Sequence, residues 1–191
     1  MINIVLDIFN YILVAILIGV SATWIVLIKS MLRTFNESPF LDKFEKKEHE
    51  KPKVSIILPA RNEEKFIEKC LNSLLNQDYD NYEIITINDS STDSTGNIIK
   101  EYSKKFPKII SVDAKPKPDG WIGKNWACIE GYKKASGDLL LFTDADTTHT
   151  SSVISLAVSH LLSLELDALT VIPRMLCLDK ITKITLPMIS T

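Results

Sequence analysis

The tripeptide Asp144-Ala145-Asp146 directly follows the apolar run from Leu139 to Thr143. In an extended chain, residues two positions apart point to the same side, so the two carboxylates can converge on one cation. Carboxylate oxygens are hard ligands, and they suit Mg²⁺ or Mn²⁺ better than zinc. The remaining coordination would come from water and from the oxygens of a phosphorylated substrate. The tripeptide therefore predicts a site for a divalent metal and a diphosphate.

The position of this pair in the chain strengthens the prediction. The apolar run before Asp144 predicts a strand that is buried on both faces, as in a parallel sheet. Parallel sheets bind their ligands beyond the carboxyl ends of the strands, and the pair lies at such an end. An exposed pair of aspartates in a surface loop is the alternative. Charged residues upstream favour the site.

Two of these upstream residues are Asp89 and Lys124. Asp89 follows a predicted strand, so it is expected at the same sheet edge as Asp144, where it could accept from a nucleobase or a ribose hydroxyl. Asp93 and its serine neighbours are typical of a helix N-cap. Lys124 ends a long, proline-rich loop before a helix whose N–H groups could face phosphate, and its ammonium could contact a diphosphate there. A solvated surface lysine is the alternative.

Strand and helix patterns alternate after Pro52, and apolar residues recur at helical spacing between positions 66 and 75. This alternation predicts the α/β class, with a mostly parallel, layered sheet. Ala127, Gly131 and Ala135 lie four apart, so one helix face is nearly flat and can approach the sheet closely. The expected strands are 54–58, 83–87, 109–112, 139–143 and 168–172, and the expected helices are 63–75, 94–106, 125–135 and 151–165.

The N-terminal segment predicts a transmembrane helix. The 21 residues from Ile8 to Ile28 carry no charge, and as a helix they would span about 31 Å, the thickness of a bilayer core. A signal peptide is disfavoured because the first residues, MINIVLD, contain no Lys or Arg and no clear cleavage site follows. We expect an anchor over residues 1–30 and a juxtamembrane linker over 31–52.

Charge and cysteine usage indicate where the rest of the chain lies. No basic residue precedes the span, so the positive-inside rule predicts a single-pass protein of the cell membrane with its soluble part in the cytoplasm. The odd number of cysteines, without metal-type spacing, favours reduced thiols. The net charge of -2 gives no indication of a nucleic-acid partner. The basic residues after the span are Lys29, Arg33, Lys43, Lys46, Lys47, Lys51 and Lys53.

Two other phosphate-binding motifs, the Rossmann fingerprint and the P-loop, are absent from the sequence. The chain contains no Gly-x-Gly, so the Rossmann fingerprint is absent. Near Lys124 the glycine spacing is too short for a P-loop, and Asn125 replaces the Ser or Thr that would hold Mg²⁺. The segment from Asp144 to Thr148 resembles the nucleophile motif of haloacid dehalogenase-like phosphatases. In that family, however, the motif lies on the first strand, and here only Glu165, Asp167 and Asp179 remain as later acids.

Four segments resemble the family 2 glycosyltransferases in order and spacing: VSIILPARNEE, INDSSTDST, GWIGKNWACIEGYKKASGD and LLLFTDAD. The likeness covers about residues 54–173. It implies a GT-A fold with a nucleotide-sugar-binding half, here residues 53–175, followed by an acceptor half. The GWIGKNWAC segment is most similar to the hopene- or carotenoid-associated branch, which acts on lipid acceptors.

The resemblance also implies site residues and a reaction. Asp89 would bond to the nucleobase, Lys124 would lie by the diphosphate, Asp144 would contact ribose or metal, and Asp146 would ligate the metal. The reaction would be an inverting, metal-assisted transfer of sugar from a nucleotide sugar to a lipid acceptor. The border of the nucleobase would be formed by Pro59, Ala60, Arg61 and Glu63.

The family pattern stops before its acceptor half. The family's catalytic base is an Asp or Glu in that half, usually followed by a Gln/Arg-x-x-Arg-Trp motif, and neither follows Ile172. Residues 176–191 resemble only the start of an acceptor or membrane-associated part, so the base is expected beyond the end of the chain. Three explanations stay open at this point: a truncated glycosyltransferase, a second chain that completes the site, and a donor-binding remnant without turnover.

Overall fold

The structure is a computed structural model of the 191-residue chain, and it describes residues 2–37, 41 and 51–171. The chain divides into two compact units. One contains residues 1–43 and 174–191, and the other contains residues 44–173. The predicted segment 176–191 lies outside the described residues, and the predicted domain boundaries stay predictions.

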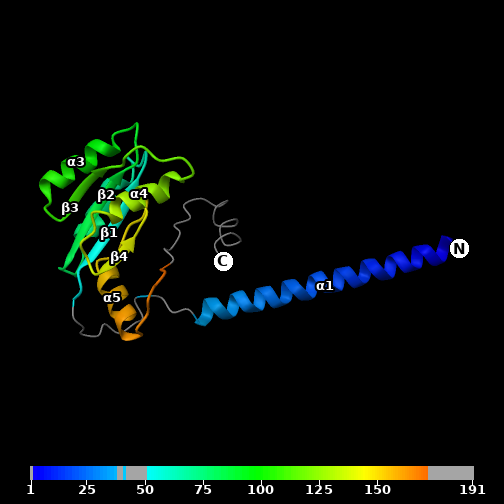
Figure 1. The fold of residues 1–191 in the computed structure, drawn as a ribbon. Coiled ribbons are helices and arrows are strands. Elements are labelled where there is room, and N and C mark those ends of the chain that lie inside the picture. The colour runs from blue at the N-terminus through cyan, green and yellow to red at the C-terminus, as the bar shows by residue number, and fades with distance from the viewer. Residues whose placement is uncertain (1, 38–40, 42–50, 172–191) are drawn as a thin grey trace. The chain divides into compact units, whose positions relative to one another are not determined.

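The second unit is built on a four-stranded parallel sheet in the order β3-β2-β1-β4 (Figure 1). Ala60, Asn88 and Asp113 are paired across the ends of three strands, so the carboxyl ends of β1, β2 and β3 are level. This architecture confirms the predicted α/β class with a parallel sheet. The strands are β1 (Val54–Ala60), β2 (Tyr82–Asn88), β3 (Ile109–Asp113) and β4 (Leu139–Phe142).

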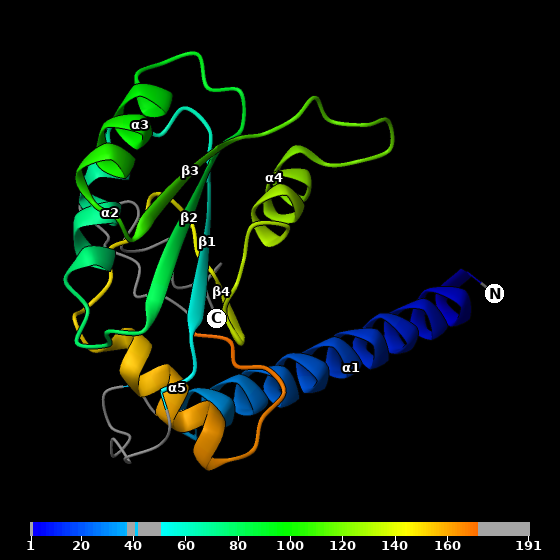
Figure 2. The same cartoon turned by 60° about the vertical axis from the view of Figure 1, so that its left-hand side comes forward.

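Helices cover both faces of this sheet. Figure 2 shows α2 (Ile67–Leu75) and α3 (Thr95–Lys105) on one face and α4 (Gly123–Tyr132) on the other. Successive strand residues point to opposite faces. Leu58 therefore belongs to the larger core cluster with residues of α2 and α5 (Val153–Ser163), whereas Ile57 belongs to the smaller cluster under α4.

The flat face predicted on α4 lies against the sheet. Ala127 is fully buried in the cluster that contains Ile57, Ile85 and Ile87. A Cβ added to Gly131 would lie 2.5 Å from Cδ1 of Ile87, which is closer than real Cβ atoms approach. The absence of a side chain at Gly131 therefore sets how closely α4 packs on the sheet.

Three expectations about the elements were wrong. Residues 168–171 form no strand, and Ile172 lies outside the described residues. Helix α2 begins at Ile67 instead of Glu63, and residues 64–66 form a turn in which the carbonyl of Glu63 accepts from the N–H groups of Phe66 and Ile67. Strand β4 is not buried on both faces. Leu140 is 40% exposed and Phe142 is 56% exposed, since α4 packs on β1 and β2.

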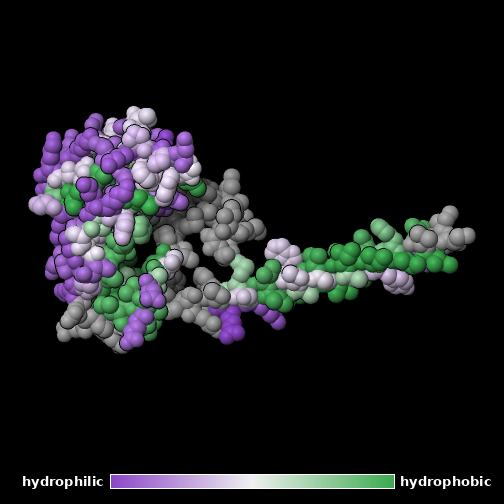
Figure 3. All heavy atoms as spheres, in the orientation of Figure 1, coloured by the Kyte–Doolittle hydropathy of each residue, from purple (hydrophilic) through white to green (hydrophobic). Residues whose placement is uncertain are grey.

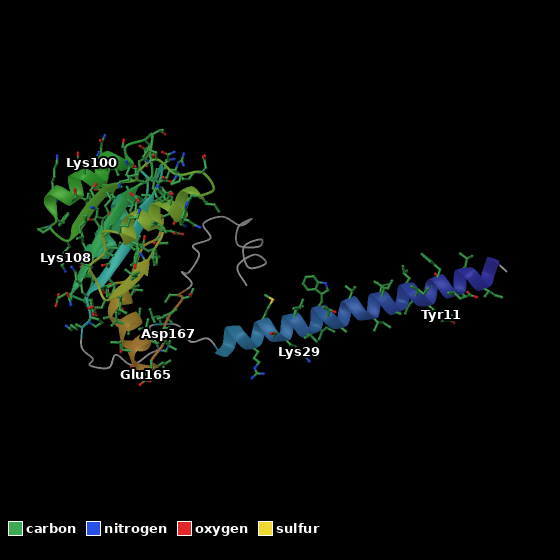
Figure 4. All side chains as sticks on the ribbon, viewed as in Figure 1. Tyr11, Lys29, Lys100, Lys108, Glu165 and Asp167 are labelled. Carbon is green, nitrogen blue, oxygen red and sulfur yellow. The ribbon has the colours of Figure 1, made fainter. Side chains whose placement is uncertain are left out.

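The first unit contains helix α1, Ile2–Glu37, and Figure 3 shows hydrophobic residues along most of its length. Residues Leu6–Arg33 are long and apolar enough to cross a membrane, and an 18-residue window within them has a mean hydropathy of 2.6. Tyr11 and Lys29 both lie on this helix (Figure 4). The helix continues beyond residue 30, where a linker was expected, so residues 31–37 are helical.

A polar network ties the amino-terminal edge of the sheet to the loop before β4. The carboxylate of Glu83 accepts hydrogen bonds from Oγ of Ser55 at 2.6 Å, from Nζ of Lys53 at 2.8 Å and from N–H of Ser136 at 2.8 Å. Burial alone would raise the pKa of Glu83, but these hydrogen bonds lower it to about 2. The network therefore stabilises the ionised carboxylate inside the fold.

We predict that Glu83→Gln destabilises the domain in a pH-dependent manner. Because the folded-state pKa is depressed, the stabilisation is complete above pH 4.5 and is lost as the pH falls towards 2. A depression of this size corresponds to up to about 3 kcal/mol of unfolding free energy at neutral pH. Urea unfolding at pH 7 and pH 3 measures the difference.

The control for this prediction is Glu101→Gln, since Glu101 is exposed on α3. The unfolding free energy of Glu101→Gln should nearly equal that of the wild type at both pH values. An equal loss of stability at pH 7 and pH 3 in Glu83→Gln would contradict the role given to the ionised carboxylate.

Candidate functional site

A pocket of about 400 Å³ lies at the carboxyl edge of the sheet, where the loops after β1, β2 and β4 meet the first turn of α4. Gly123 and Ala145 also line it. The sequence analysis had selected eight residues from four separate segments, and all of them line this one pocket: Pro59, Ala60, Arg61, Glu63, Asp89, Lys124, Asp144 and Asp146. Their individual roles stay predictions.

The loops after β1 and β2 are tied to each other by their backbones and by Asn62. The N–H of Asp89 donates to the carbonyl of Ala60 at 2.9 Å. Oδ1 of Asn62 accepts from N–H of Thr92 at 2.8 Å, and Asn62 adopts a positive φ of 57°. Asparagine is one of the residues that tolerate this backbone conformation. The two loops therefore form one wall of the pocket.

Arg61 and Asp89 face each other on this wall. Nη1 of Arg61 lies 3.8 Å from Oδ2 of Asp89, whose side chain is only 14% exposed. A Cβ added to Gly123 would lie 3.2 Å from the same carboxylate oxygen. Gly123, the first residue of α4, therefore leaves room for Asp89. The sequence analysis gave Gly123 no role, although its place beside Lys124 in the GWIGKN segment could have indicated one.

Lys124 and Asp144 form a close ion pair across the pocket. Nζ of Lys124 lies 2.6 Å from Oδ1 of Asp144, and the two side chains are 59% and 54% exposed. This hydrogen bond raises the pKa of Lys124, so the side chain stays an ammonium at physiological pH. The first turn of α4 thus brings a fixed positive charge to the aspartate pair.

The turn that carries Asp144 is held by polar side chains behind it. Oγ1 of Thr147 donates to the carbonyl of Asp144 at 2.7 Å. Nε2 of His149 lies 3.1 Å from Oγ1 of Thr147 and 3.0 Å from Oγ1 of Thr143. Burial lowers the pKa of His149, which favours a neutral imidazole. Thr147 and His149 were not among the predicted site residues.

The carboxyl group of Glu63 holds its proton more strongly than an ordinary glutamate does. The pKa of Glu63 is raised by burial and then by the nearby carboxylates Asp146, Asp93 and Asp144. Among the described residues, no group of three or more His, Cys, Asp or Glu could hold a metal ion by itself. Asp144 and Asp146 offer the hard oxygens that fit Mg²⁺ or Mn²⁺, if water and phosphate complete the coordination. The donor set therefore fits a metal that is shared with a bound phosphate.

The acidic residues that follow Asp146 in the described part of the chain lie away from the pocket. In Figure 4, Glu165 and Asp167 lie by the end of α5, whereas Lys100 lies at the opposite end of this unit. Lys100 pairs at 3.1 Å with Asp113, the last residue of β3, so it marks the carboxyl edge of the sheet. Glu165 and Asp167 therefore cannot support Asp144 as a phosphatase nucleophile, and Asp179 lies outside the described residues.

The chain is an α/β protein with a parallel sheet, and its charged pocket lies at the carboxyl edge, where proteins with such sheets bind their ligands. Residues 55–180 match the Glycosyl transferase family 2 domain, and the chain belongs to this family. Membership confirms the resemblance drawn from the four sequence segments. It is incompatible with the haloacid dehalogenase-like alternative.

Curated relatives are longer than this chain. The probable glycosyltransferase YdaM of Bacillus subtilis is 36% identical over 142 residues, which cover 69% of this chain and 33% of the relative. The 4,4'-diaponeurosporenoate glycosyltransferase of Staphylococcus haemolyticus is 40% identical over 93 residues, which cover 49% of this chain and 24% of the relative. The chain thus spans a third or less of these two proteins.

Two solved structures share the fold of this chain. The mannosyltransferase PcManGT of Pyrobaculum calidifontis, in complex with GDP-Man and Mn²⁺, matches with a TM-score of 0.57 and 23% identity, over 71% of this chain and 39% of that chain. Staphylococcus aureus TarS, in complex with UDP, matches with a TM-score of 0.51 and 27% identity, over 64% of this chain and 39% of that chain. The predicted GT-A fold is confirmed.

We predict that Lys124→Gln raises the affinity of the nucleotide-free protein for Mn²⁺. The substitution removes the ammonium that lies 2.6 Å from Asp144 and leaves the carboxylates uncompensated. Exposed ion pairs contribute at most about 1 kcal/mol, so we expect a gain of roughly two- to fivefold. Electron paramagnetic resonance of free Mn²⁺ measures the affinity. Lys134→Gln, an exposed lysine just after α4, is the matched control. Equal affinities in the two variants would show that the ion pair does not affect the metal.

Proposed function

We propose that the pocket binds a nucleotide sugar together with Mg²⁺ or Mn²⁺, and that the whole protein transfers the sugar to an acceptor. The observation that carries this proposal is the convergence of Arg61 and Lys124 with the carboxylates of the pocket at the carboxyl edge of a parallel sheet. The matched structures of PcManGT with GDP-Man and Mn²⁺ and of TarS with UDP support it.

The wall between β1 and β2 would receive the nucleoside. The Asp89 carboxylate is mostly buried and is held beside Arg61, so it could accept a hydrogen bond from a nucleobase N–H in a fixed direction. Pro59 and Ala60 end β1 and would border the base, together with Arg61 and Glu63. Residues at the ends of the strands, which the sheet holds in place, would orient the donor for reaction, and such orientation contributes to catalysis.

The opposite side of the pocket would receive the diphosphate. Lys124 would donate to the diphosphate oxygens from the first turn of α4, whose free N–H groups also favour an anion. Asp146 would hold the metal, and Asp144 would contact the metal or the ribose. When bound, a divalent cation would neutralise charge on the diphosphate as it leaves. Thr147 would keep Asp144 in place through its bond to the Asp144 carbonyl.

The reaction proposed is an inverting transfer. An acceptor hydroxyl attacks the anomeric carbon on the face opposite the nucleoside diphosphate, the bond from that carbon to the diphosphate oxygen breaks, and a base removes the hydroxyl proton. Lys124 stabilises the negative charge that develops on the leaving group. The pocket carboxylates are assigned to the donor and the metal, so the base comes from another part of the whole protein.

A lipid acceptor at the cell membrane fits the chain best. The carotenoid-related name of the Staphylococcus haemolyticus relative supports it. So does a dolichyl-phosphate sugar transferase of Methanococcus voltae, 43% identical over 97 residues. Helix α1 would anchor the chain through its uncharged stretch from Ile8 to Ile28. The basic residues after this stretch, beginning with Lys29 and Arg33 in the last part of α1, would keep the pocket in the cytoplasm.

We expect Asp146→Ala to abolish Mn²⁺-dependent binding of the nucleotide sugar, because one remaining carboxylate holds the cation inadequately. Titration calorimetry of the full chain in detergent, with UDP- and GDP-hexoses and with Mn²⁺ or excess EDTA, measures this loss. Asp167→Ala is the matched control, because Asp167 is exposed and lies away from the pocket (Figure 4). Unchanged binding in Asp146→Ala would refute the metal role of this residue.

A transfer assay distinguishes an active glycosyltransferase from a donor-binding remnant and from a site that a second chain completes. Membranes that contain the full chain are supplied with labelled nucleotide sugars, Mn²⁺ and a lipid extract, and the released nucleoside diphosphate and the labelled lipid are measured. We expect release that is lost in both Lys124→Gln and Asp146→Ala. Donor binding without release would favour a donor-binding remnant or a second chain that completes the site. The absence of both would contradict the proposed function.

A further inference from the structure

The outward surface around the start of α4 exposes apolar and aromatic side chains. Trp121 is 41% exposed and Ile122 is 70% exposed, at the end of the loop between β3 and α4. Figure 2 shows this loop extending beyond the edge of the sheet. Apolar side chains gathered on one surface typically mark a contact with another molecule or a membrane. Trp121 and Ile122 directly precede the pocket residues Gly123 and Lys124.

The surface continues along the outer side of α4. Trp126 and Ile129 lie three residues apart on α4, and the C-cap residue Lys133 follows four residues later, so these three side chains share one helix face. Ile122 is the N-cap residue directly before the helix. The opposite face contains Ala127 and Gly131, which pack on the sheet. The outer face of α4 is therefore an amphipathic stripe that points away from the core.

The loop is held in a shape that presents Trp121 instead of burying it. Nε1 of Trp126 donates to the carbonyl of Lys115 at 2.9 Å, which fixes the start of the loop to α4. The rings of Trp121 and Trp126 meet edge to face, with their centroids 5.5 Å apart. The N–H of Trp121 donates to the carbonyl of Pro118 at 3.3 Å. The exposure of Trp121 and Ile122 is thus part of a braced conformation.

Lysines lie near these apolar side chains, and one of them, Lys133, also pairs with Glu130 at 2.7 Å. Lys115 and Lys117 are exposed in the loop, with Asp119 as its one acidic residue. Nζ of Lys133 lies 4.8 Å from the centroid of the Trp126 ring. Tryptophan, aliphatic residues and lysine together are typical of protein segments that lie in the headgroup region of a bilayer. The same chain contains α1, which is long and apolar enough to cross a membrane.

We propose that the surface formed by the loop residues 115–122 and the outer face of α4 docks on the anionic headgroup layer of the membrane, with Trp121 and Ile122 inserted at its apolar boundary. The lysines of the loop would pair with anionic lipid, and the aromatic rings would lie at headgroup level. This inference rests on the membrane anchorage proposed above. It goes beyond that anchorage, because it holds the mouth of the pocket at the bilayer surface, where a lipid acceptor is presented.

The three tryptophans of the chain, Trp24, Trp121 and Trp126, allow a direct test. The full chain is reconstituted in vesicles of phosphatidylcholine and phosphatidylglycerol whose acyl chains are either unmodified or brominated, because bromine quenches tryptophan only at close range. Trp121→Phe/Trp126→Phe leaves Trp24, which reports whether α1 is inserted. Trp24→Phe and Trp24→Phe/Trp121→Phe differ only by Trp121, and both retain Trp126, which braces the loop.

We expect bromolipid to quench Trp24 in the first variant and to quench Trp24→Phe at least twofold more strongly than Trp24→Phe/Trp121→Phe. Quenching of Trp24 with no contribution from Trp121 would overturn the docking surface and leave the anchorage intact. The absence of quenching in every variant would overturn both. Circular dichroism of each variant shows whether it is folded.

A second arm tests the charges and the aliphatic side chain. In the Trp24→Phe background, Lys115→Ser/Lys117→Ser and Ile122→Ser should each reduce the quenching of Trp121 by at least half. The matched controls are Lys104→Ser/Lys105→Ser at the end of α3 and Leu164→Ser, 56% exposed, just after α5, and they should leave it unchanged. Quenching that is equal with and without phosphatidylglycerol, or equally reduced by the controls, would contradict a specific docking surface.

Discussion

The parallel pairing of β1 with β2 on one side and β4 on the other is the constraint on which the site depends. Because β1 is central in this order, the loops that leave β1, β2 and β4 emerge together at one edge. Arg61, Asp89 and Asp144 are far apart in the sequence and meet only for this reason. A slip of one residue in either pairing would turn alternate strand side chains to the other face, bury the wrong set and separate these loops.

The pocket created at this edge is unbalanced in charge. Four carboxylates line it, those of Glu63, Asp89, Asp144 and Asp146, against the two cations Arg61 and Lys124. The raised pKa of Glu63, caused by burial and by the neighbouring carboxylates, reflects this excess. A diphosphate alone would meet repulsion here, whereas a diphosphate that arrives with a divalent cation brings the missing positive charge. The excess of negative charge in the pocket thus agrees with joint binding of donor and metal.

Much of this arrangement could be predicted from the sequence, because it follows from local patterns. Alternating strand and helix signals predicted the parallel α/β sheet, and the four motif segments selected the residues that line the pocket. The support from Thr147 and His149 could not be predicted, since it depends on a turn that brings their side chains behind Asp144. The exposure of Phe142 also escaped prediction, because an apolar run does not indicate which of its faces a helix covers.

The start of α2 and the expected strand after α5 failed for a related reason. The helical spacing of apolar residues begins at Phe66, so it gives no signal for a helix over residues 63–65. Periodicity is weakest at the boundary of an element. Residues 168–171 are apolar in part, yet none of them pairs with β4.

Gly131 fixes the distance between α4 and the sheet, and this distance affects both the pocket end and the outer face of the helix. With the missing side chain at this position, α4 rests directly on Ile57 and Ile87, so the height of the helix above the sheet is fixed by atoms in contact. Lys124 in the first turn of α4 and Trp126, two residues further along, would both be displaced if the helix moved away from the sheet. The absence of one methyl group at residue 131 therefore determines how far Lys124 and Trp126 lie from the sheet.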